Sequence, residues 1–570
     1  MTRPLVAPLI AILAVVLASS MAAMSQTPPE RATKPRVPEE QKPESGAGPP
    51  AIDRTPVLPP ADPLPGRSLS AIGSIRVEHI VLEGRTVLTE QELSRISGPY
   101  EGRVVTIDEL NALRRELTEA YIRLGYVNSG VIIPDQEVVG GTVVLREVCG
   151  KLAKINITGV GRFTRGFINR RLKEAARQPL QIQDLQKSLE LLQQEPMIQR
   201  VNARLLPGLL PGEAELEVAV KAAHPLQVVI GTDNRRSVST GGEQATLSLA
   251  HLNLTGHADV LSVDLGMSEG RGTGSASYSF PISARDTRIQ ASFSVDDAQI
   301  VEAPFDRIDI KSKTMRGALA LVHPWVRDPA RSLVSSIGIE RKHSTSTLLG
   351  VPFSFSPGDR EGKSDTTVVN VGVEWTARAR NHILMLNGNV RRGLPVFQTT
   401  ISETEPDGRF TAFLGQLQYA RRAGPFSGEL LFRGMTQYAF DSLLGIEKMP
   451  IGGFNTVRGY RENRAVRDNG LAVTVEWRIP MRRERKGAFD PLNLRIAPFA
   501  DYGRSWDRDG RIFPSQPLDI YSTGVGLLWS PVPGLRADLY WAHPFANRHR
   551  PGNNLQDKGF HFAVQYKVPL

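Results

Sequence analysis

The chain has 570 residues, of which 41% are hydrophobic, and its 69 Lys and Arg against 59 Asp and Glu give a net charge of +10. After the first 25 residues no segment approaches 18 consecutive apolar residues, which excludes a bundle of membrane-spanning helices. The single Cys excludes a disulfide framework and a multi-cysteine metal site within the chain. A membrane β-barrel remains compatible with this composition, because half of each strand faces a polar lumen.

Residues 1–25 are typical of a secretory signal peptide. Arg3 precedes an apolar run from Leu9 to Ala18, and the small residues Ala22, Ala23 and Ser25 follow it. The run is too short to span a bilayer, and a signal anchor would need a longer one. We therefore expect cleavage near Ser25 and export across an inner membrane.

Residues 26–73 form a proline-rich linker with 12 prolines in 48 positions. Each proline lacks a backbone donor and clashes with the preceding helical turn, so a stable helix is not expected here. The composition predicts a semi-extended spacer.

Two small α+β modules are predicted next, over residues 74–150 and 151–222. In the first, Thr89 with Glu92 and Thr106 with Glu109 are capping boxes that open two helices, and Gly125 ends the second helix. Strands are expected from Ile75 to Val81 with a break at His79, and over residues 131–133 and 143–148. The second module repeats the order, with strands at 152–158, 198–206 and 213–220 and helices at 164–177 and 182–194. The two modules form an internal repeat.

Residues 225–570 show segment after segment of alternating apolar and polar residues, which is the period of a β-strand with two different faces. At about 20 residues for a strand and its connection, this region predicts about 16 antiparallel strands of a membrane β-barrel. Glu374, Glu476 and Arg478 occupy polar positions of this alternation and are expected to face the lumen. A soluble sandwich or propeller has similar alternation, but the signal peptide and the last strand, which alternates from Phe560 to Leu570, favour the barrel.

Two short motifs lie in the last third of the chain. The first is a Gly-rich loop that contains Val457, Arg458, Gly459 and Tyr460, and the second is Phe499-Ala500-Asp501-Tyr502-Gly503 on a predicted late strand. Neither belongs to an enzyme: the phosphate-binding loop, the nucleophile elbow and the zinc-protease motif are all missing from the sequence. No cofactor, metal site or nucleic-acid partner is expected. The run from Gly270 to Gly274 has the wrong spacing for a dinucleotide site and is interpreted as a turn.

The first module and the two late motifs resemble known families. Gly125, Tyr126 and Ser129, followed by Pro134 and Gln136, are similar to the first POTRA domain of two-partner secretion transporters, which secrete filamentous haemagglutinins and haemolysins. The loop and the Asp501 motif are similar to motifs that these transporters share with Bam-type assembly factors. Cys149 departs from the family pattern, which has an acidic residue at this position. Because a lone Cys usually behaves as a small apolar residue, we expect Cys149 to be buried.

The resemblance implies a monomeric outer-membrane pore with its POTRA domains in the periplasm of a Gram-negative cell. It implies that the loop folds into the lumen, where Arg458 pairs with Asp501, and that an unfolded exoprotein is the partner, with lipid around the barrel. An assembly or insertion factor of the same superfamily is the alternative, and a passive porin is a third possibility. Some family members carry an N-terminal helix that plugs the pore, but the proline-rich linker here argues against one.

Overall fold

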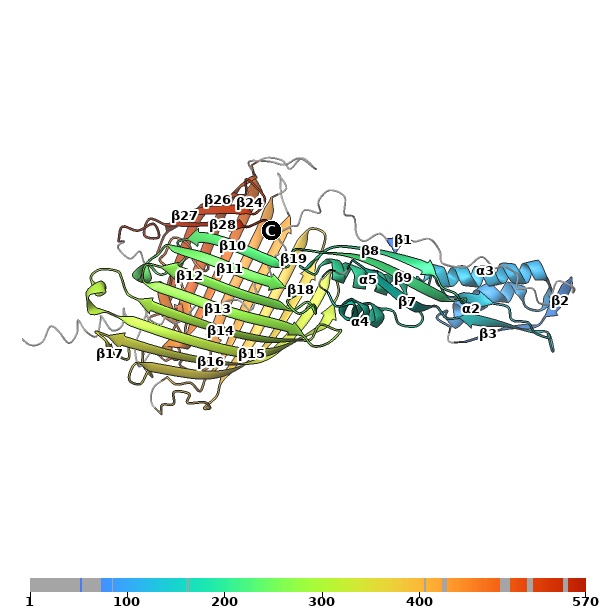
Figure 1. Cartoon of the computed structure of the whole chain (residues 1–570), viewed down its shortest axis with the longest axis horizontal. Helices are drawn as coiled ribbons and strands as arrows, with labels where there is room; N and C mark the ends of the chain where they lie inside the picture. The colour runs from blue at the N-terminus through green and yellow to red at the C-terminus, as the bar shows by residue number, and fades with distance from the viewer. Residues whose placement is uncertain are drawn as a thin grey trace, which may run out of the picture. The chain divides into compact units, whose positions relative to one another are not determined.

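The computed structural model describes residues 52–53, 73–84, 86–159, 161, 163–403, 406–422, 428–481, 493–509, 516–546 and 552–570. The described residues form two compact units, one within residues 46–223 and one from His224 onwards (Figure 1). The predicted signal peptide and most of the predicted linker lie outside the described residues. Within the described part, no helix combines the length and apolarity needed to cross a membrane.

The first module contains two capped helices beside short strands. Its elements are β2 (Ser74–Val77), β3 (His79–Glu83), α2 (Glu90–Ser97), η2 (Gly98–Tyr100), β4 (Arg103–Thr106), α3 (Ile107–Arg123), β5 (Gly130–Ile132) and β6 (Thr142–Val148). Both predicted capping boxes are present, because Thr89 and Thr106 each accept from the backbone of the Glu three residues later. The predicted first strand is instead two strands: β2 pairs with β4, whereas β3 joins the sheet β3-β6-β5. Glu78 marks the change of partner, since its backbone nitrogen donates to Gly141.

The second module has the predicted order of elements. They are β7 (Lys151–Thr158), α4 (Arg165–Ala175), α5 (Ile182–Gln193), β8 (Ile198–Pro207) and β9 (Glu213–Ala222). The sheet order is β1-β8-β9-β7, in which β1 (Ile52–Asp53) comes from the predicted linker and pairs in parallel with Ala203 and Arg204. The linker is therefore not a spacer throughout, because two of its residues extend the edge of this sheet.

The second unit is a closed barrel of sixteen antiparallel strands, which confirms the predicted fold. The first and last strands, β10 and β28, pair antiparallel from Val229 with Lys567 to Asp233 with Ala563. The strands are β10 (Leu226–Asp233), β11 (Gln244–Leu252), β12 (Val260–Ser268), β13 (Arg271–Pro281), β14 (Arg288–Gln299), β15 (Lys311–Arg327), β16 (Arg331–Leu348), β18 (Lys363–Arg378), β19 (His382–Gly393), β20 (Thr411–Arg422), β21 (Glu429–Ala439), β24 (Asn469–Pro480), β25 (Leu494–Trp506), β26 (Leu518–Trp529), β27 (Leu535–Pro544) and β28 (Phe560–Lys567). The two-residue β17 (Val351–Pro352) is not counted as a barrel strand, because it only pairs antiparallel with the last two residues of β16.

The alternation places apolar side chains outside the barrel and polar ones inside. Met267 is 71% exposed and Ile337 is 54% exposed on the outer face, whereas Glu476 is fully buried on the lumen side. Exposed apolar side chains on an isolated barrel are those that lipid covers in a membrane. Buried charges of the barrel such as Glu476 lie on the lumen side.

Three local expectations are wrong. The strand β28 ends at Lys567 rather than Leu570, because Pro569 has no backbone donor with which to continue the ladder. The run from Gly270 to Gly274 is mostly strand, since β13 begins at Arg271 and only the hairpin turn precedes it. Cys149 is exposed rather than buried, because it lies in the short connection between β6 and β7.

Candidate functional site

The segment between β21 and β24 enters the barrel as a folded hairpin. It contains η6 (Gly445–Glu447) and the strand β22 (Met449–Ile451), which pairs antiparallel with β23 (Ala465–Arg467). The hairpin, which we call the lumen loop (residues 440–468), is held on the wall by a small apolar cluster that joins it to β24 and β26. The cluster consists of Met449, Ile451, Val457, Tyr460, Ala472 and Ile520.

Two consecutive glycines turn the lumen loop after β22. Gly452 and Gly453 have φ angles of +108° and +96°, which residues other than glycine rarely adopt. A Cβ on Gly453 would also lie 2.2 Å from the Glu462 carboxyl carbon. The turn is closed by Thr456, whose hydroxyl accepts from the Gly452 backbone nitrogen at 2.8 Å.

Arg458 lies at the centre of the loop and is 1% exposed. Its Nε donates to Asp501 Oδ2 at 2.8 Å and its Nη2 to Asp501 Oδ1 at 2.9 Å, which is a bidentate pair. The Arg458 backbone nitrogen adds a third bond to Asp501 at 3.0 Å, and Nη1 donates to Glu476 Oε2 at 2.6 Å. Burial disfavours the charged guanidinium, but the hydrogen bonds to Asp501 outweigh it and raise the pKa of Arg458. The structure therefore brings the two motifs of the sequence together and adds Glu476 from β24.

Aromatic rings cover the guanidinium. The Phe499 ring centre lies 3.4 Å from Arg458 Cζ and the Tyr540 ring centre lies 4.9 Å from it. Such contacts contribute most where water is excluded. The Tyr540 hydroxyl also donates to Glu476 Oε1 at 3.3 Å. Tyr540 therefore contacts both Arg458 and the carboxylate that pairs with it.

The other motif residues fit the loop to the wall. Val457 is fully buried, and a Cβ on Gly503 would lie 2.6 Å from a Val457 methyl carbon. Gly503 is therefore the gap in the wall that receives Val457. Gly459 donates its backbone nitrogen to His561 Nε2 at 3.1 Å, and the Tyr460 hydroxyl donates to the Ala546 carbonyl at 2.6 Å.

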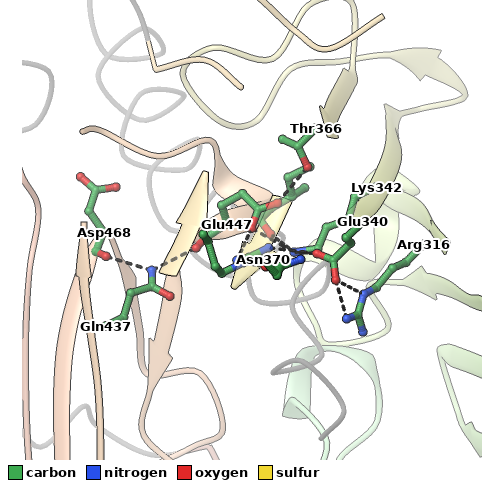
Figure 2. A network of polar contacts seen from close by, with 10 residues as sticks. Arg316, Glu340, Lys342, Thr366, Asn370, Gln437, Glu447 and Asp468 are labelled. Atoms are coloured by element: carbon green, nitrogen blue, oxygen red, sulfur yellow. Dashed lines mark hydrogen bonds and ion pairs between the residues drawn. The ribbon is translucent and has the colours of Figure 1, made fainter. Parts of the chain in front are cut away.

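A second polar cluster holds the beginning of the lumen loop against a different part of the wall (Figure 2). Glu447 in η6 accepts from Arg391 Nη1 at 2.6 Å and from Lys342 Nζ at 3.1 Å through Oε2. Its Oε1 accepts from the Thr366 hydroxyl at 2.8 Å. These partners come from β19, β16 and β18. Burial opposes ionisation of Glu447, but the Arg391 and Lys342 cations outweigh it and lower the pKa of its carboxyl.

The wall residues of this cluster are also paired with one another. Glu340 accepts from Arg391 Nη2 at 2.9 Å and from Arg316 Nε at 2.7 Å. On the loop side, Gln437 Nε2 donates to the backbone carbonyls of Glu447 and Asp468, both at 3.0 Å. The amide of Gln437 thereby connects the first and the last part of the lumen loop.

Sequence reasoning missed Glu447 and the bond of Glu476 to Arg458. Glu476 was recognisable as a lumen residue from its position in the alternation, but its partner depends on how the loop folds. Glu447 lies outside any strand, so no periodicity marks it, and its wall partners are at least 56 residues away in the sequence.

The POTRA signature residues lie at the junction of the two modules and beside the central strand β6. Gly125 has a φ of +92° and its carbonyl accepts from the Ile182 backbone nitrogen at the start of α5. Tyr126 packs on the core of the first module, and the buried Ser129 hydroxyl accepts from the Gly150 backbone nitrogen at 2.9 Å. Gln136 bonds to both the backbone nitrogen and the carbonyl of Val144 at 2.7 Å. Its amide thus continues the pairing with β6 beyond the end of β5, which stops at Ile132 opposite Arg146. It also contacts the Pro134 carbonyl at 3.3 Å.

No group of three or more His, Cys, Asp or Glu that could hold a metal ion occurs among the residues that the structure describes. The chemistry of the site is ion pairing and hydrogen bonding between a loop and its wall. Such contacts hold a segment in place and can be exchanged for others.

Residues 212–528 match the family model described as haemolysin secretion/activation protein ShlB/FhaC/HecB, and residues 75–150 match the ShlB-type POTRA domain. Among curated relatives, the outer membrane transporter CdiB of Dickeya dadantii is 24% identical over 435 residues, covering 70% of this chain and 72% of the relative. The hemolysin transporter protein ShlB of Serratia marcescens is 25% identical over 467 residues, covering 79% and 77%.

Two solved structures share the fold. CdiB from Escherichia coli superposes with a TM-score of 0.66 at 20% identity, covering 90% of this chain and 94% of that one. BamA from Haemophilus ducreyi, lacking POTRA domains 1–3, gives a TM-score of 0.52 at 13% identity, covering 87% and 100%.

Proposed function

Because the chain belongs to the haemolysin secretion/activation family, which confirms the resemblance seen in its sequence, we propose that it secretes a partner exoprotein through its barrel. The protein is an outer-membrane translocation pore with periplasmic POTRA domains. The observation that carries the proposal is the lumen loop, which occupies the barrel. Ion pairs from Arg458 to Asp501 and Glu476, and from Glu447 to Arg391, hold it there.

The POTRA modules would receive the unfolded exoprotein as an added strand. The edge of β8 accepts the chain's own Ile52 and Asp53 in parallel pairing, which supports the idea that this edge takes a further strand. Backbone hydrogen bonds at a sheet edge do not depend on sequence, so they suit a partner that is still unfolded. The exoprotein would then compete with residues 52–53 for β8.

The lumen loop would close the pore at rest and move aside for the exoprotein. Its two anchors lie on separate parts of the wall, Arg458 on β24 and β25 and Glu447 on β16, β18 and β19. A loop fixed at two points resists displacement more than one fixed at a single point. Breaking a buried pair by removing one partner costs about 3–5 kcal/mol, because the remaining charge is left buried without a partner. Substitution at either anchor should therefore loosen the loop.

An assembly or insertion factor is the second candidate. The likeness to BamA concerns the fold alone, at 13% identity. The family model and the ShlB-type POTRA match favour secretion.

The test is secretion by Arg458→Ala, with the exoprotein that disappears from the culture medium when this gene is deleted taken as the partner. We expect the amount of partner outside the cell to fall strongly, because Asp501 and Glu476 lose their shared cation. Arg504→Ala is the matched control, since Arg504 lies on the same strand as Asp501 but its side chain is 48% exposed. Heat-modifiable migration on gels verifies that both variants are inserted.

If an inserted Arg458→Ala barrel still secretes the partner at the wild-type level, the lumen loop has no part in the mechanism. A general loss of other outer-membrane proteins in a strain without this gene, with the partner unaffected, would instead establish the assembly function.

A further inference from the structure

We propose that Arg391, Lys342 and Thr366 form a carboxylate-binding site on the lumen wall, which Glu447 fills at rest and acidic side chains of the exoprotein fill during passage. The inference rests on the proposed function for its second occupant. Its first occupant, the carboxylate of Glu447, is part of the structure (Figure 2).

The site has the chemistry of a carboxylate receptor. Oε2 of Glu447 receives two cationic donors, Arg391 Nη1 at 2.6 Å and Lys342 Nζ at 3.1 Å, and Oε1 receives the Thr366 hydroxyl at 2.8 Å. Both oxygens of one carboxylate are thus bonded, and hydrogen bonds between ionised groups are the stronger kind.

The arginine of the receptor is held in the wall independently of the occupant. Glu340 orients Arg391 through Nη2 at 2.9 Å, and Asn370 Oδ1 accepts from Arg391 Nε at 3.1 Å. All donors of the site therefore come from barrel strands, whereas the occupant comes from the lumen loop. When the loop moves, Arg391 keeps its wall partners, whereas Lys342 also loses its bond to the Ile446 carbonyl at 3.2 Å.

Displacement of the loop leaves an excess of positive charge at this place. The wall contributes three cations, Arg316, Arg391 and Lys342, and one carboxylate, Glu340. Without Glu447 the cluster carries a net charge of +2, in a pore that water enters. An unfolded chain passing through offers carboxylates of the same kind as the one that has left, so exchange of one carboxylate for another lowers the barrier to moving the loop.

Chemical rescue tests the receptor directly. Glu447→Ala removes the carboxylate but leaves its donors, so the full-length protein in planar bilayers should show more frequent openings than wild type. Acetate or propionate added to this variant should bind between Arg391 and Lys342 and restore the closed state. Propionamide, which has nearly the same shape and no charge, should be ineffective.

A second variant shows whether acetate acts at the receptor, because it removes one donor of the site. In Glu447→Ala with Arg391→Gln the concentration of acetate needed for rescue should rise by about tenfold or more, since a charge-assisted bond of about 1.5–3 kcal/mol is lost. Glu361→Gln is the matched control, because Glu361 is an exposed loop carboxylate outside the cluster. Its openings should be those of wild type.

A peptide experiment addresses the second occupant. A short unstructured peptide with several Glu should interrupt the current of the Glu447→Ala channel at lower concentration than the same peptide with Gln, and Arg391→Gln should abolish the difference. Failure of acetate to rescue would overturn the receptor. Rescue by acetate with equal effects of the Glu and Gln peptides would overturn the exchange while leaving the proposed secretion function intact.

Discussion

At the scale of single residues, the lumen loop depends on charges that are buried and mutually satisfied. Arg458 makes three bonds to Asp501 if its backbone nitrogen is counted, and one to Glu476. Because Asp501 accepts more of these bonds than Glu476 does, we expect it to contribute more to holding the loop. Asp501 holds both the side chain and the backbone of the loop, whereas Glu476 also retains Arg478 at 2.8 Å when Arg458 is lost.

Asp501→Asn should therefore release the loop more than Glu476→Gln does. Removing the charge of Asp501 leaves Arg458 buried without its bidentate partner, at a cost of about 3–5 kcal/mol. The resistance of the folded barrel to heat in detergent, followed by gel migration, measures the effect. Equal losses for the two variants would contradict this ranking, and Glu361→Gln should leave the transition unchanged.

The carboxyl of Glu462, in the lumen loop outside the strands, gives the loop a dependence on pH. Burial raises its pKa to about 8 from the ordinary 4.5. The protonated form is thus the one that the folded loop favours. Its stabilising effect is complete below about pH 4.5, weakens as pH rises from there, and is lost above about pH 8.

Channel openings should accordingly become more frequent as pH rises from about 4.5 to about 8 in the wild-type protein. Glu462→Gln should flatten this profile, because an amide carries no titrating proton but can still accept from the Phe454 backbone nitrogen, now bonded at 2.6 Å. An unchanged slope in Glu462→Gln would assign the pH dependence to other groups.

At the scale of elements, a glycine after α3 forms one of the contacts between the two α+β modules. Gly125 ends the helix at a φ of +92° and its carbonyl receives Ile182 from the next module. A Cβ there would meet the Gln183 side chain at 2.0 Å. The residue that stops a helix is thus also the one that allows the second module to approach.

Gly125→Ala should loosen the junction through two separable effects. The left-handed backbone costs about 1–2 kcal/mol for a residue with a Cβ, and the contact with Gln183 adds to it. Cleavage of the full-length protein by dilute protease between the modules should increase in Gly125→Ala. The double variant with Gln183→Ala should recover part of the resistance, and complete recovery would show that the backbone conformation costs nothing.

At the scale of the whole molecule, the barrel sorts side chains by face, and adjacent residues have opposite surroundings. Ile337 points outward and is 54% exposed, whereas its neighbour Ser336 belongs to the lumen side. The closing pair β10 and β28 removes the free edges that such a long sheet would otherwise expose.

Ile337→Arg should hinder folding into lipid, because an arginine on the lipid face near the middle of the bilayer costs about 2–4 kcal/mol. Ser336→Arg places the same guanidinium one residue away in the lumen and should fold nearly as well as wild type. Urea titration of folding into vesicles measures both. Comparable losses would contradict the assignment of the faces.

The sequence by itself determined the features that repeat locally. The alternation from Leu261 to Met267 and in the other strands predicted a barrel of about sixteen strands, and the capping boxes at Thr89 and Thr106 predicted the starts of two helices. These signals are visible because each depends on residues only two to four positions apart.

Only the tertiary structure decided which distant residues meet. The bonds from Glu447 to Arg391, from Gly459 to His561 and from β1 to β8 join residues 56, 102 and about 150 positions apart. No periodicity encodes such pairs. The first two follow from the path of the lumen loop inside the barrel, and the third from the return of the linker to the sheet of the second module. The sequence therefore identified the pore, whereas the folded chain shows how its loop is held.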